Sequence, residues 1–361
     1  MTLPLSGIRI VSMAEQYPGP YATLLMADLG AEVILVERPQ GGDPARQFPE
    51  FHAALNRNKK AITIDLKSEQ GRMALENLLA NTDIFMEGFR PGAMARLGFG
   101  PEQLAVRHPR LVYVSISGFG QSGPYRDRPA HDLSYQGIAG LLFAAARTVN
   151  PSPTSDIASG DLTAGMFATI GSLAALLERT RTGKGGHVDV SMTDCLVSTM
   201  TALLGPMMNG QEPADIGAEP AYGTFICGDD KLLTLSIAHE DWFWLPFCQL
   251  VGMEDKSTLR RGERVRQAEA LTSRIAMALR ARPRHEWGEI FDAAGIPWGP
   301  VNDLNEVISD VHFKERGMFG RLSDADGALR WHVLQPLLFS GQRPGPVCGV
   351  PSLGADNEEV L

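Results

Sequence analysis

The chain has 361 residues, of which 44% are hydrophobic and 21% charged, and its net charge is −9. This composition is typical of a soluble globular protein with a large core, organised as two domains or as one large domain. The acidic balance argues against nucleic acid as the main partner.

Cysteine spacing and the amino-terminal residues bear on the cellular compartment. The four cysteines form neither a C-x-x-C pair nor a metal-binding spacing with histidine, so we expect no disulfide framework and no metal site. A reduced, cytoplasmic environment follows. The sequence begins MTLPLSGIRIVSM, without a basic region ahead of an apolar core, and no uncharged apolar run reaches the length of a membrane span. We therefore expect neither a signal peptide nor a membrane partner.

The first 120 residues alternate between strand and helix patterns. A Pro-Gly turn at Pro18 to Pro20 opens the first helix, and Gly30 ends it. Strands are expected at residues 8–13, 31–37, 61–66, 83–87 and 111–117, and helices at 21–29 and 69–80. The repeated β-α-β order is the unit of a parallel sheet, so the predicted class is α/β, with a Rossmann-like architecture.

A G-x-G-x-x-G motif, from Gly118 to Gly123, follows the fifth strand. In a dinucleotide-binding fold this motif opens a helix, whereas here the sequence PYRDRP follows. We therefore reject the dinucleotide interpretation and expect a flexible loop. Such a loop lets a ligand approach the backbone or closes over a site.

Two acid–base candidates stand at the starts of apolar helices. His131 precedes a helix expected at residues 133–146, and Asp161 precedes one at 162–178. Helices that are apolar nearly all round are normally buried, so both groups are expected where buried helices begin, beside backbone N–H groups. The alternatives are a plain N-cap role for Asp161 and a buried, hydrogen-bonded core histidine at position 131.

The second half predicts a smaller α+β unit. A strand at 187–191 leads into a helix from Met192, and residues 205–217 have the composition of a linker. A hairpin is expected from strands at 222–226 and 232–237, followed by helices at 241–250, 263–281, 285–294 and 304–310. A loop fixed by Gly and Pro is expected at 294–301. The tail from residue 321 is poor in strand patterns and is expected to return to the first domain.

Basic residues stand in three loops of the first half. Arg38 and Arg90 follow strands, and Arg57, Lys59 and Lys60 precede one. In an acidic chain, cations at strand ends suit a phosphate-bearing ligand in the crevice of a parallel sheet. The alternative is solvated surface charge, which most Arg and Lys side chains represent.

Ordered motifs along the whole chain resemble the family III CoA-transferase superfamily, which contains CoA-transferases and α-methylacyl-CoA racemases. The matching stretches are LSGIRIV with PGP, DLGAEV through RPQGGDP, NRNKK, FRPG, GFG and TGKG. The resemblance implies acyl-CoA as substrate and an interlocked homodimer. It also implies a Rossmann-like large domain built from residues 1–200 and 321–361, a linker at 201–220 and a small α+β domain at 221–320.

The resemblance further implies roles for particular residues. In the transferases, the aspartate that matches Asp161 attacks the acyl-CoA thioester. In the racemases it is an acid–base group, paired with a histidine that matches His131 and helped by a glutamate that matches Glu240. Asp241 stands where the racemase pattern has proline. Candidate CoA-binding residues are Arg38, Arg57, Lys59, Lys60, Arg90, Gly118, Gly120, Tyr125 and Tyr135.

These residues favour 1,1-proton transfer at the α-carbon of a 2-methylacyl-CoA, because imidazole and carboxylate can exchange the roles of base and acid on opposite faces. We expect backbone N–H groups at the start of the helix after Asp161 to stabilise the enolate oxygen. One alternative is CoA transfer to a carboxylic acid through an Asp161 acyl anhydride and an aspartyl-CoA thioester. The other is a non-catalytic CoA-binding protein.

Overall fold

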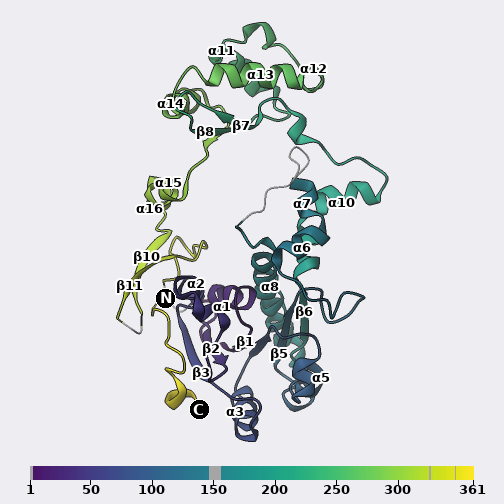
Figure 1. The fold of residues 1–361 in the computed structure, drawn as a ribbon, viewed down its shortest axis with the longest axis vertical. Coiled ribbons are helices and arrows are strands. Elements are labelled where there is room, and N and C mark those ends of the chain that lie inside the picture. Colours follow the sequence, from purple (N-terminus) through teal and green to yellow (C-terminus); the bar gives the residue numbers. More distant parts are fainter. Residues whose placement is uncertain (1–2, 146–155, 325–326, 346) are drawn as a thin grey trace. The chain divides into compact units, whose positions relative to one another are not determined.

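The computed structural model describes residues 3–145, 156–324, 327–345 and 347–361, and the chain forms two compact units (Figure 1). Unit 1 consists of Met1–Thr201 and Arg316–Leu361, and unit 2 of Ala202–Glu315. The two ends of the chain therefore belong to the same unit.

Unit 1 is built on a six-stranded parallel sheet in the order β3-β2-β1-β4-β5-β6. Its strands are β1 (Arg9–Met13), β2 (Glu32–Glu37), β3 (Lys59–Thr63), β4 (Ile84–Glu87), β5 (Val112–Ser117) and β6 (His187–Ser191). The inner strands are buried almost throughout, as parallel strands covered on both faces are. The predicted α/β class is confirmed. Because the chain order reverses between β1 and β4, a crevice opens at their carboxyl ends.

Helices α1 (Pro18–Asp28) and α8 (Ser159–Thr182) pack together against one face of this sheet (Figure 1). Gly165 of α8 lies so close to α1 that an added Cβ would come within 2.9 Å of the Pro18 carbonyl oxygen. Thr169 Oγ1 donates a hydrogen bond to the Ala22 carbonyl at 3.3 Å. By length and composition α8 could cross a membrane, but its α1-facing side is part of the core of unit 1.

The predicted helix at 133–146 is divided into α6 (Asp132–Ala139) and α7 (Leu141–Ala145), and Ala146 lies outside the described residues. Gly140 ends α6 with a φ of 87°, a left-handed conformation that glycine adopts without strain. The expectation that both helices are buried all round is wrong. Phe143 of α7 is 84% exposed, and Ile170 and Leu177 of α8 are 58% and 67% exposed.

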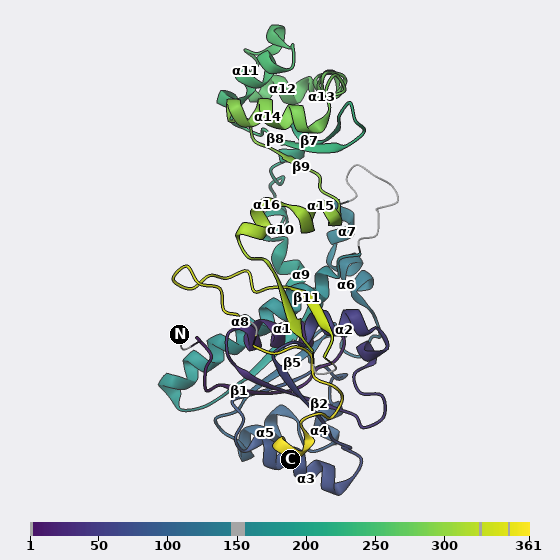
Figure 2. The same ribbon diagram turned by 90° about the vertical axis from the view of Figure 1, so that its left-hand side faces the viewer.

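The other face of the sheet is covered by α3 (Glu69–Leu79), α4 (Ala93–Arg96) and α5 (Pro101–Arg107) (Figure 2). Leu75, Met94 and Leu104 of these helices share an apolar cluster with Phe85 and Tyr113 of the sheet. The remaining elements of the first part of the chain are η1 (Pro44–Gln47), α2 (Pro49–Leu55) and α9 (Met192–Thr199).

The carboxyl-terminal part of unit 1 contains a hairpin of β10 (Phe319–Ser323) and β11 (Leu329–Val333), so the expectation of a strand-poor tail is wrong. The last residues, including α17 (Asn357–Val360), lie along the outer edge of β3. The Ala61 N–H donates to the Asp356 carboxylate at 2.7 Å, and the Thr63 N–H donates to Asn357 Oδ1 at 2.8 Å. The tail thereby covers an edge that would otherwise present free backbone groups.

Unit 2 has a three-stranded antiparallel sheet of β7 (Tyr222–Ile226), β8 (Leu232–Ser236) and β9 (Trp298–Pro300). Its core gathers Trp244, Phe247 and Phe291. The helical elements of this unit are α10 (Thr201–Met208), which begins at the last residue of unit 1, η2 (Ile216–Ala218), α11 (Asp241–Leu250), η3 (Glu254–Lys256), α12 (Arg261–Arg266), α13 (Ala268–Leu279), α14 (Arg284–Ala294), α15 (Leu304–Ser309) and α16 (Val311–Glu315).

Three expectations for this region are corrected. The helix expected at 263–281 is interrupted at Gln267, whose φ of −109° and ψ of 16° separate α12 from α13. The Gly/Pro-rich loop contains β9, because residues 298–300 pair with β8. The first part of the expected linker at 205–217 is helical, since it belongs to α10.

Candidate active site

A cavity of about 730 Å³ opens at the carboxyl ends of β1, β4 and β5. Residues 14–18 and 88–91, which follow β1 and β4, and residues 116–119, at the end of β5 and just after it, form three of its walls, and the segment 126–135 forms a fourth. Phe51 of α2, and Asp161 and Met192 at the starts of α8 and α9, complete the lining. This is the place where an open parallel sheet binds its ligand.

Asp161 lies in the first turn of α8, and burial together with the neighbouring Asp132 carboxylate raises its pKa to about 7. Asp132 Oδ1 accepts hydrogen bonds from the N–H groups of Gly160 at 2.7 Å and Asp161 at 3.1 Å. Its Oδ2 accepts one from the Gln136 side chain. Asp132 therefore caps α8 from another helix, and Asp161 is left free to act as an acid or base near neutral pH.

The backbone donors predicted for an enolate oxygen are already occupied. The N–H groups of Gly160 and Asp161 donate to Asp132, and the Leu162 N–H donates to the Ala158 carbonyl at 3.0 Å. This prediction is wrong because the carboxylate that fills the start of α8 comes from α6, about thirty positions earlier in the sequence.

His131 is the N-cap residue of α6 and lines the same cavity as Asp161. It is exposed, so the alternative of a buried core histidine does not hold. Tyr135, one turn later, is buried, and its hydroxyl donates to the Ala130 carbonyl at 2.9 Å. Its ring covers Gly118, where an added Cβ would come within 2.6 Å of the ring. Burial raises the pKa of Tyr135, so the hydroxyl remains a donor at neutral pH.

Only one of the five predicted basic residues, Arg90, lines the cavity. Arg57 is 2% exposed and forms a salt bridge of 2.6 Å with the buried Asp28. Lys59 is also buried, and its Nζ donates to the Pro20 carbonyl and to Asn56 Oδ1, each at 2.8 Å. Buried side chains whose donors are already bonded cannot contact a phosphate group. Arg57 and Lys59 therefore stabilise the fold.

The other two predicted cations lie outside the cavity wall. Lys60 forms salt bridges with Glu32 at 3.0 Å and with Glu359 at 2.6 Å, on the edge that the tail covers. Arg38 is exposed, and its Nε donates to the Gly42 carbonyl at 2.7 Å. Its guanidinium therefore remains accessible to a ligand that extends beyond the cavity.

Arg126 and Arg128 line the cavity, and we did not predict them. The Arg126 guanidinium lies beside Gly92, 3.2 Å from the position of an added Cβ. Within the described ranges, neither arginine has a carboxylate at salt-bridge distance. The signal that could have revealed them is the position of the PYRDRP segment, which ends two residues before His131.

Two predicted loop residues, Gly120 and Tyr125, do not line the cavity. Tyr125 packs edge-on against Phe119 with ring centroids 5.6 Å apart, and the Arg128 guanidinium lies 5.4 Å from the Tyr125 ring centroid. These contacts stabilise the loop from outside the cavity lining.

Glu15, which we also did not predict, lines the cavity. Burial and the nearby Asp43 carboxylate raise the pKa of Glu15 to about 7.

Glu240 belongs to unit 2, where it is the N-cap residue of α11 and its Oε2 accepts from the Ala238 N–H at 3.0 Å. The next residue, Asp241, forms salt bridges with the fully buried Arg264 and with Arg260. Asp241 thus anchors a buried arginine where a proline could not. The structure brings His131 and Asp161 together within unit 1 and places Glu240 in the other unit.

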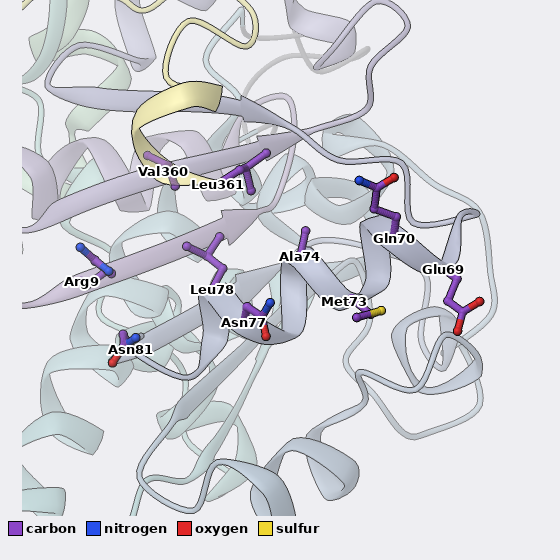
Figure 3. Close-up of a pocket in the computed structure, with 10 residues that line it drawn as sticks. All are labelled: Arg9, Glu69, Gln70, Met73, Ala74, Asn77, Leu78, Asn81, Val360 and Leu361. Atoms are coloured by element: carbon purple, nitrogen blue, oxygen red, sulfur yellow. The ribbon is translucent and has the colours of Figure 1, made fainter.

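A second cavity of about 670 Å³ lies along α3 (Figure 3). It is bordered by the last residues of the chain, Val360 and Leu361. The ionisable side chains among its described lining residues are Arg9 and Glu69, and Arg9 is already paired with Glu32 at 2.6 Å. This cavity offers no acid–base pair comparable to His131 and Asp161.

Comparisons with known proteins agree with this geometry. The model of CoA-transferase family III matches residues 5–357. The chain is 33% identical to acetyl-CoA:oxalate CoA-transferase from Acetobacter aceti over 87% of this chain and 85% of that protein. It is 30% identical to α-methylacyl-CoA racemase from Homo sapiens over 99% of this chain and 93% of that protein. A crystal structure of a CAIB/BAIF family protein from Brucella suis matches with a TM-score of 0.87 and 28% identity, with full coverage of both chains.

The chain therefore belongs to CoA-transferase family III. It is an acyl-CoA enzyme, and its relatives include both CoA-transferases and racemases.

Proposed function

We propose that this enzyme racemises or epimerises a 2-methylacyl-CoA by 1,1-proton transfer. The observation that carries the proposal is the presence of His131 and Asp161 in the wall of one cavity, with the pKa of Asp161 raised to about 7. In one direction the Asp161 carboxylate takes the α-proton, and the His131 imidazolium returns a proton to the opposite face. The roles are reversed for the other enantiomer.

The cations of the cavity suit the CoA part of the substrate. Arg90, Arg126 and Arg128 all line the cavity, in an otherwise acidic chain. Guanidinium groups bind phosphate oxygens in a bidentate manner, which favours these three residues as phosphate ligands. Arg38, exposed outside the cavity, is a candidate for the distal phosphate. We also propose that the enzyme works as an interlocked homodimer.

CoA transfer is the second candidate, favoured by the identity to acetyl-CoA:oxalate CoA-transferase. In this reaction an Asp161 oxygen attacks the thioester carbon and the CoA thiolate leaves, which forms a mixed anhydride. The thiolate then attacks the Asp161 acyl carbon and the carboxylate product leaves. This gives an aspartyl-CoA thioester. An acceptor carboxylate then attacks the Asp161 acyl carbon and expels the CoA thiolate, which forms a second mixed anhydride. The thiolate finally attacks the acyl carbon of the acceptor, which yields the new acyl-CoA and releases the Asp161 carboxylate.

One experiment separates the two reactions. The enzyme is incubated in D₂O with (R)- and (S)-2-methylacyl-CoA, and in parallel with an acyl-CoA and free carboxylates such as oxalate. If each enantiomer is converted to a mixture of both, and the product carries deuterium at the α-carbon, the racemase is supported. CoA esters of the added carboxylate, with no α-deuterium, would overturn it. Trapping of an acylated Asp161 by hydroxylamine during turnover would support the transferase.

Substitutions refine the assignment. For a racemase, His131→Ala should abolish deuterium exchange from one enantiomer, and Asp161→Ala should abolish exchange from the other. Glu240→Gln should slow turnover without eliminating it, if this residue tunes a base rather than acting as one. For a transferase, Asp161→Ala should be the only one of the three changes that abolishes turnover.

A further inference from the structure

A stripe of polar side chains crosses one face of the sheet directly beneath the cavity. Ser115 of β5 is in register with Glu87 of β4 and with Asp189 of β6. The Ser115 hydroxyl is hydrogen-bonded to the Glu87 carboxyl group and lies 3.0 Å from His187 Nε2. Glu87 is 5% exposed, whereas His187, on the edge strand, is exposed. A continuous hydrogen-bonded chain thus leads from a buried carboxyl group to the surface.

The two carboxylates of this stripe each hold a loop of the cavity. Glu87 Oε2 accepts a hydrogen bond from the Phe89 N–H at 2.8 Å, within the loop 88–91 that carries Arg90. Asp189 Oδ2 accepts one from the Gln121 N–H at 2.9 Å, next to the loop 116–119. One wall of the cavity, and the segment that follows a second wall, are therefore each held by a carboxyl group.

The surroundings of Glu87 bring its ionisation close to neutral pH. Burial and, to a smaller extent, the Asp189 carboxylate raise the pKa of Glu87, the hydrogen bonds from Phe89 and Ser115 lower it, and the net result is a pKa of about 7. His187 and Asp189 face it from β6, and Tyr113 from β5 interacts with it electrostatically. The helices α4 and α5, which pack on this face, contribute Met94 and Leu104 to the core, and their charged residues Arg96, Glu102 and Arg107 are exposed.

We propose that Glu87, Ser115 and His187 are positioning residues whose proton state sets how firmly the loop 88–91 holds Arg90 against CoA. The proposal rests on the proposed acyl-CoA function and extends it. When Glu87 is ionised, its bond from the Phe89 N–H is charge-assisted and about twice as strong as a neutral one. A proton reaches Glu87 when the His187 imidazolium donates from Nε2 to Ser115 Oγ, and Ser115 passes its own hydroxyl proton to the carboxylate. Protonation therefore loosens the loop.

The test is the Kd of CoA, measured by isothermal titration calorimetry between pH 6 and pH 8.5. Binding to the unmodified enzyme should weaken by about 3- to 10-fold as the pH falls through 7, the size expected from losing a charge-assisted hydrogen bond. Glu87→Gln keeps an acceptor for the Phe89 N–H but cannot ionise, so its Kd should lack this change. At each pH, the Kd of the unmodified enzyme is divided by that of Glu87→Gln. Effects that both proteins share, from titration of the CoA phosphates and of Asp161, cancel in this ratio.

Two further variants should move the midpoint of the pH dependence of CoA binding in opposite directions. Ser115→Ala removes a hydrogen bond that lowers the pKa of Glu87, so the midpoint should rise. Asp189→Asn removes a repelling charge but retains an acceptor for the Gln121 N–H, so the midpoint should fall. A merely structural role would change the melting temperature without shifting the midpoint.

The outcomes are distinguishable. Tight CoA binding with the same pH dependence in Glu87→Gln as in the unmodified enzyme, or midpoints unmoved in both Ser115→Ala and Asp189→Asn, would overturn this inference alone. An enzyme that binds no CoA at any pH would overturn the proposed function and this inference together.

Discussion

At the scale of single residues, Asp132 and Asp161 show how position gives one chemical group two tasks. Asp132 accepts two backbone N–H bonds at the start of α8 and is engaged in the fold. Asp161 is partly buried beside that charge, which makes its own ionisation unfavourable. The capping interaction thus supplies part of the field that tunes the catalytic candidate.

We predict that Asp161→Asn stabilises the protein at alkaline pH. The pKa of Asp161 is raised above its unfolded value, so the folded state binds the proton more tightly and stability falls as the pH rises from about 4 to about 7. Asparagine avoids this cost. Urea unfolding should show a gain of about 1–2 kcal/mol at pH 8 and a smaller one at pH 5, reduced from the full linkage value because the side chain is partly hydrated. A gain that is equal at both pH values would contradict the assignment.

A second prediction separates a structural arginine from a ligand-binding one. Arg57→Ala leaves Asp28 buried without its partner and should cost about 3–5 kcal/mol in the free energy of unfolding. Arg126→Ala should change stability by less than about 0.5 kcal/mol but weaken CoA binding by about tenfold or more. Calorimetric Kd values and urea unfolding of both variants check this. Arg57→Lys, which keeps the charge, serves as a control, and a folded Arg57→Lys protein with much weaker CoA binding would refute the structural role.

At the scale of elements, glycine decides how closely α8 approaches α1. Gly165→Ala would place a Cβ 2.9 Å from the Pro18 carbonyl oxygen and from Tyr21 Cδ1. We predict a net loss of about 1–2 kcal/mol, because overpacking outweighs the gain in helix propensity. The matched control is Gly137→Ala in α6, where the nearest atom is 3.8 Å away and a small gain is expected. Thermal unfolding of both variants measures the difference, and a stabilised Gly165→Ala protein would show that the two helices are not in close contact.

The edge of β3 gives a prediction for the carboxyl-terminal segment. Asp356→Ala and Asn357→Ala each remove an acceptor from a backbone N–H of β3 and should each cost about 1 kcal/mol. The amides of Ala61 and Thr63 should then exchange their hydrogens faster. Glu358→Ala, at an exposed position of α17 directly after the two sites, is the control and should leave both amides protected. Unchanged exchange in all three variants would mean that the tail does not cover this edge.

At the scale of the whole molecule, α8 has a second group of apolar side chains that stays exposed among the described residues of unit 1. Met166, Ile170 and Leu177 are spaced to lie along one side of the helix and are 42%, 58% and 67% exposed. A contiguous exposed apolar surface of this kind is characteristic of a protein interface. It supports the proposed homodimer.

We therefore predict a mass twice that of the 39.1 kDa chain in light scattering, retained on dilution to nanomolar concentration. Ile170→Glu with Leu177→Glu should abolish this species or yield insoluble protein. Met73→Glu, at an equally exposed apolar position on α3, should leave it intact. A monomer at micromolar concentration in the unmodified protein would rule the homodimer out.

The sequence was most informative where local pattern and burial coincide. The strands of the parallel sheet and the position of Asp161 at a helix start follow from apolar periodicity, which acts over a few neighbouring positions. The residues Pro18 to Pro20, expected as a turn ahead of the helix, form the first turn of α1 itself. Boundaries were less well predicted where a distant pairing decides, as in β9, which exists because residues 298–300 lie beside β8.

For the site, the sequence alone determined which groups could do chemistry: His131 and Asp161 stand at the starts of apolar helices, and the family follows from ordered motifs. Only the tertiary structure decided which cations face the cavity, because Arg57 and Lys59 look like Arg126 and Arg128 in sequence but have carboxylate or carbonyl partners in the core. Burial and pairing are set by residues far apart in the chain. The same physical reason explains why Asp132 fills the start of α8 and leaves the carboxyl group of Asp161 with a pKa near neutrality.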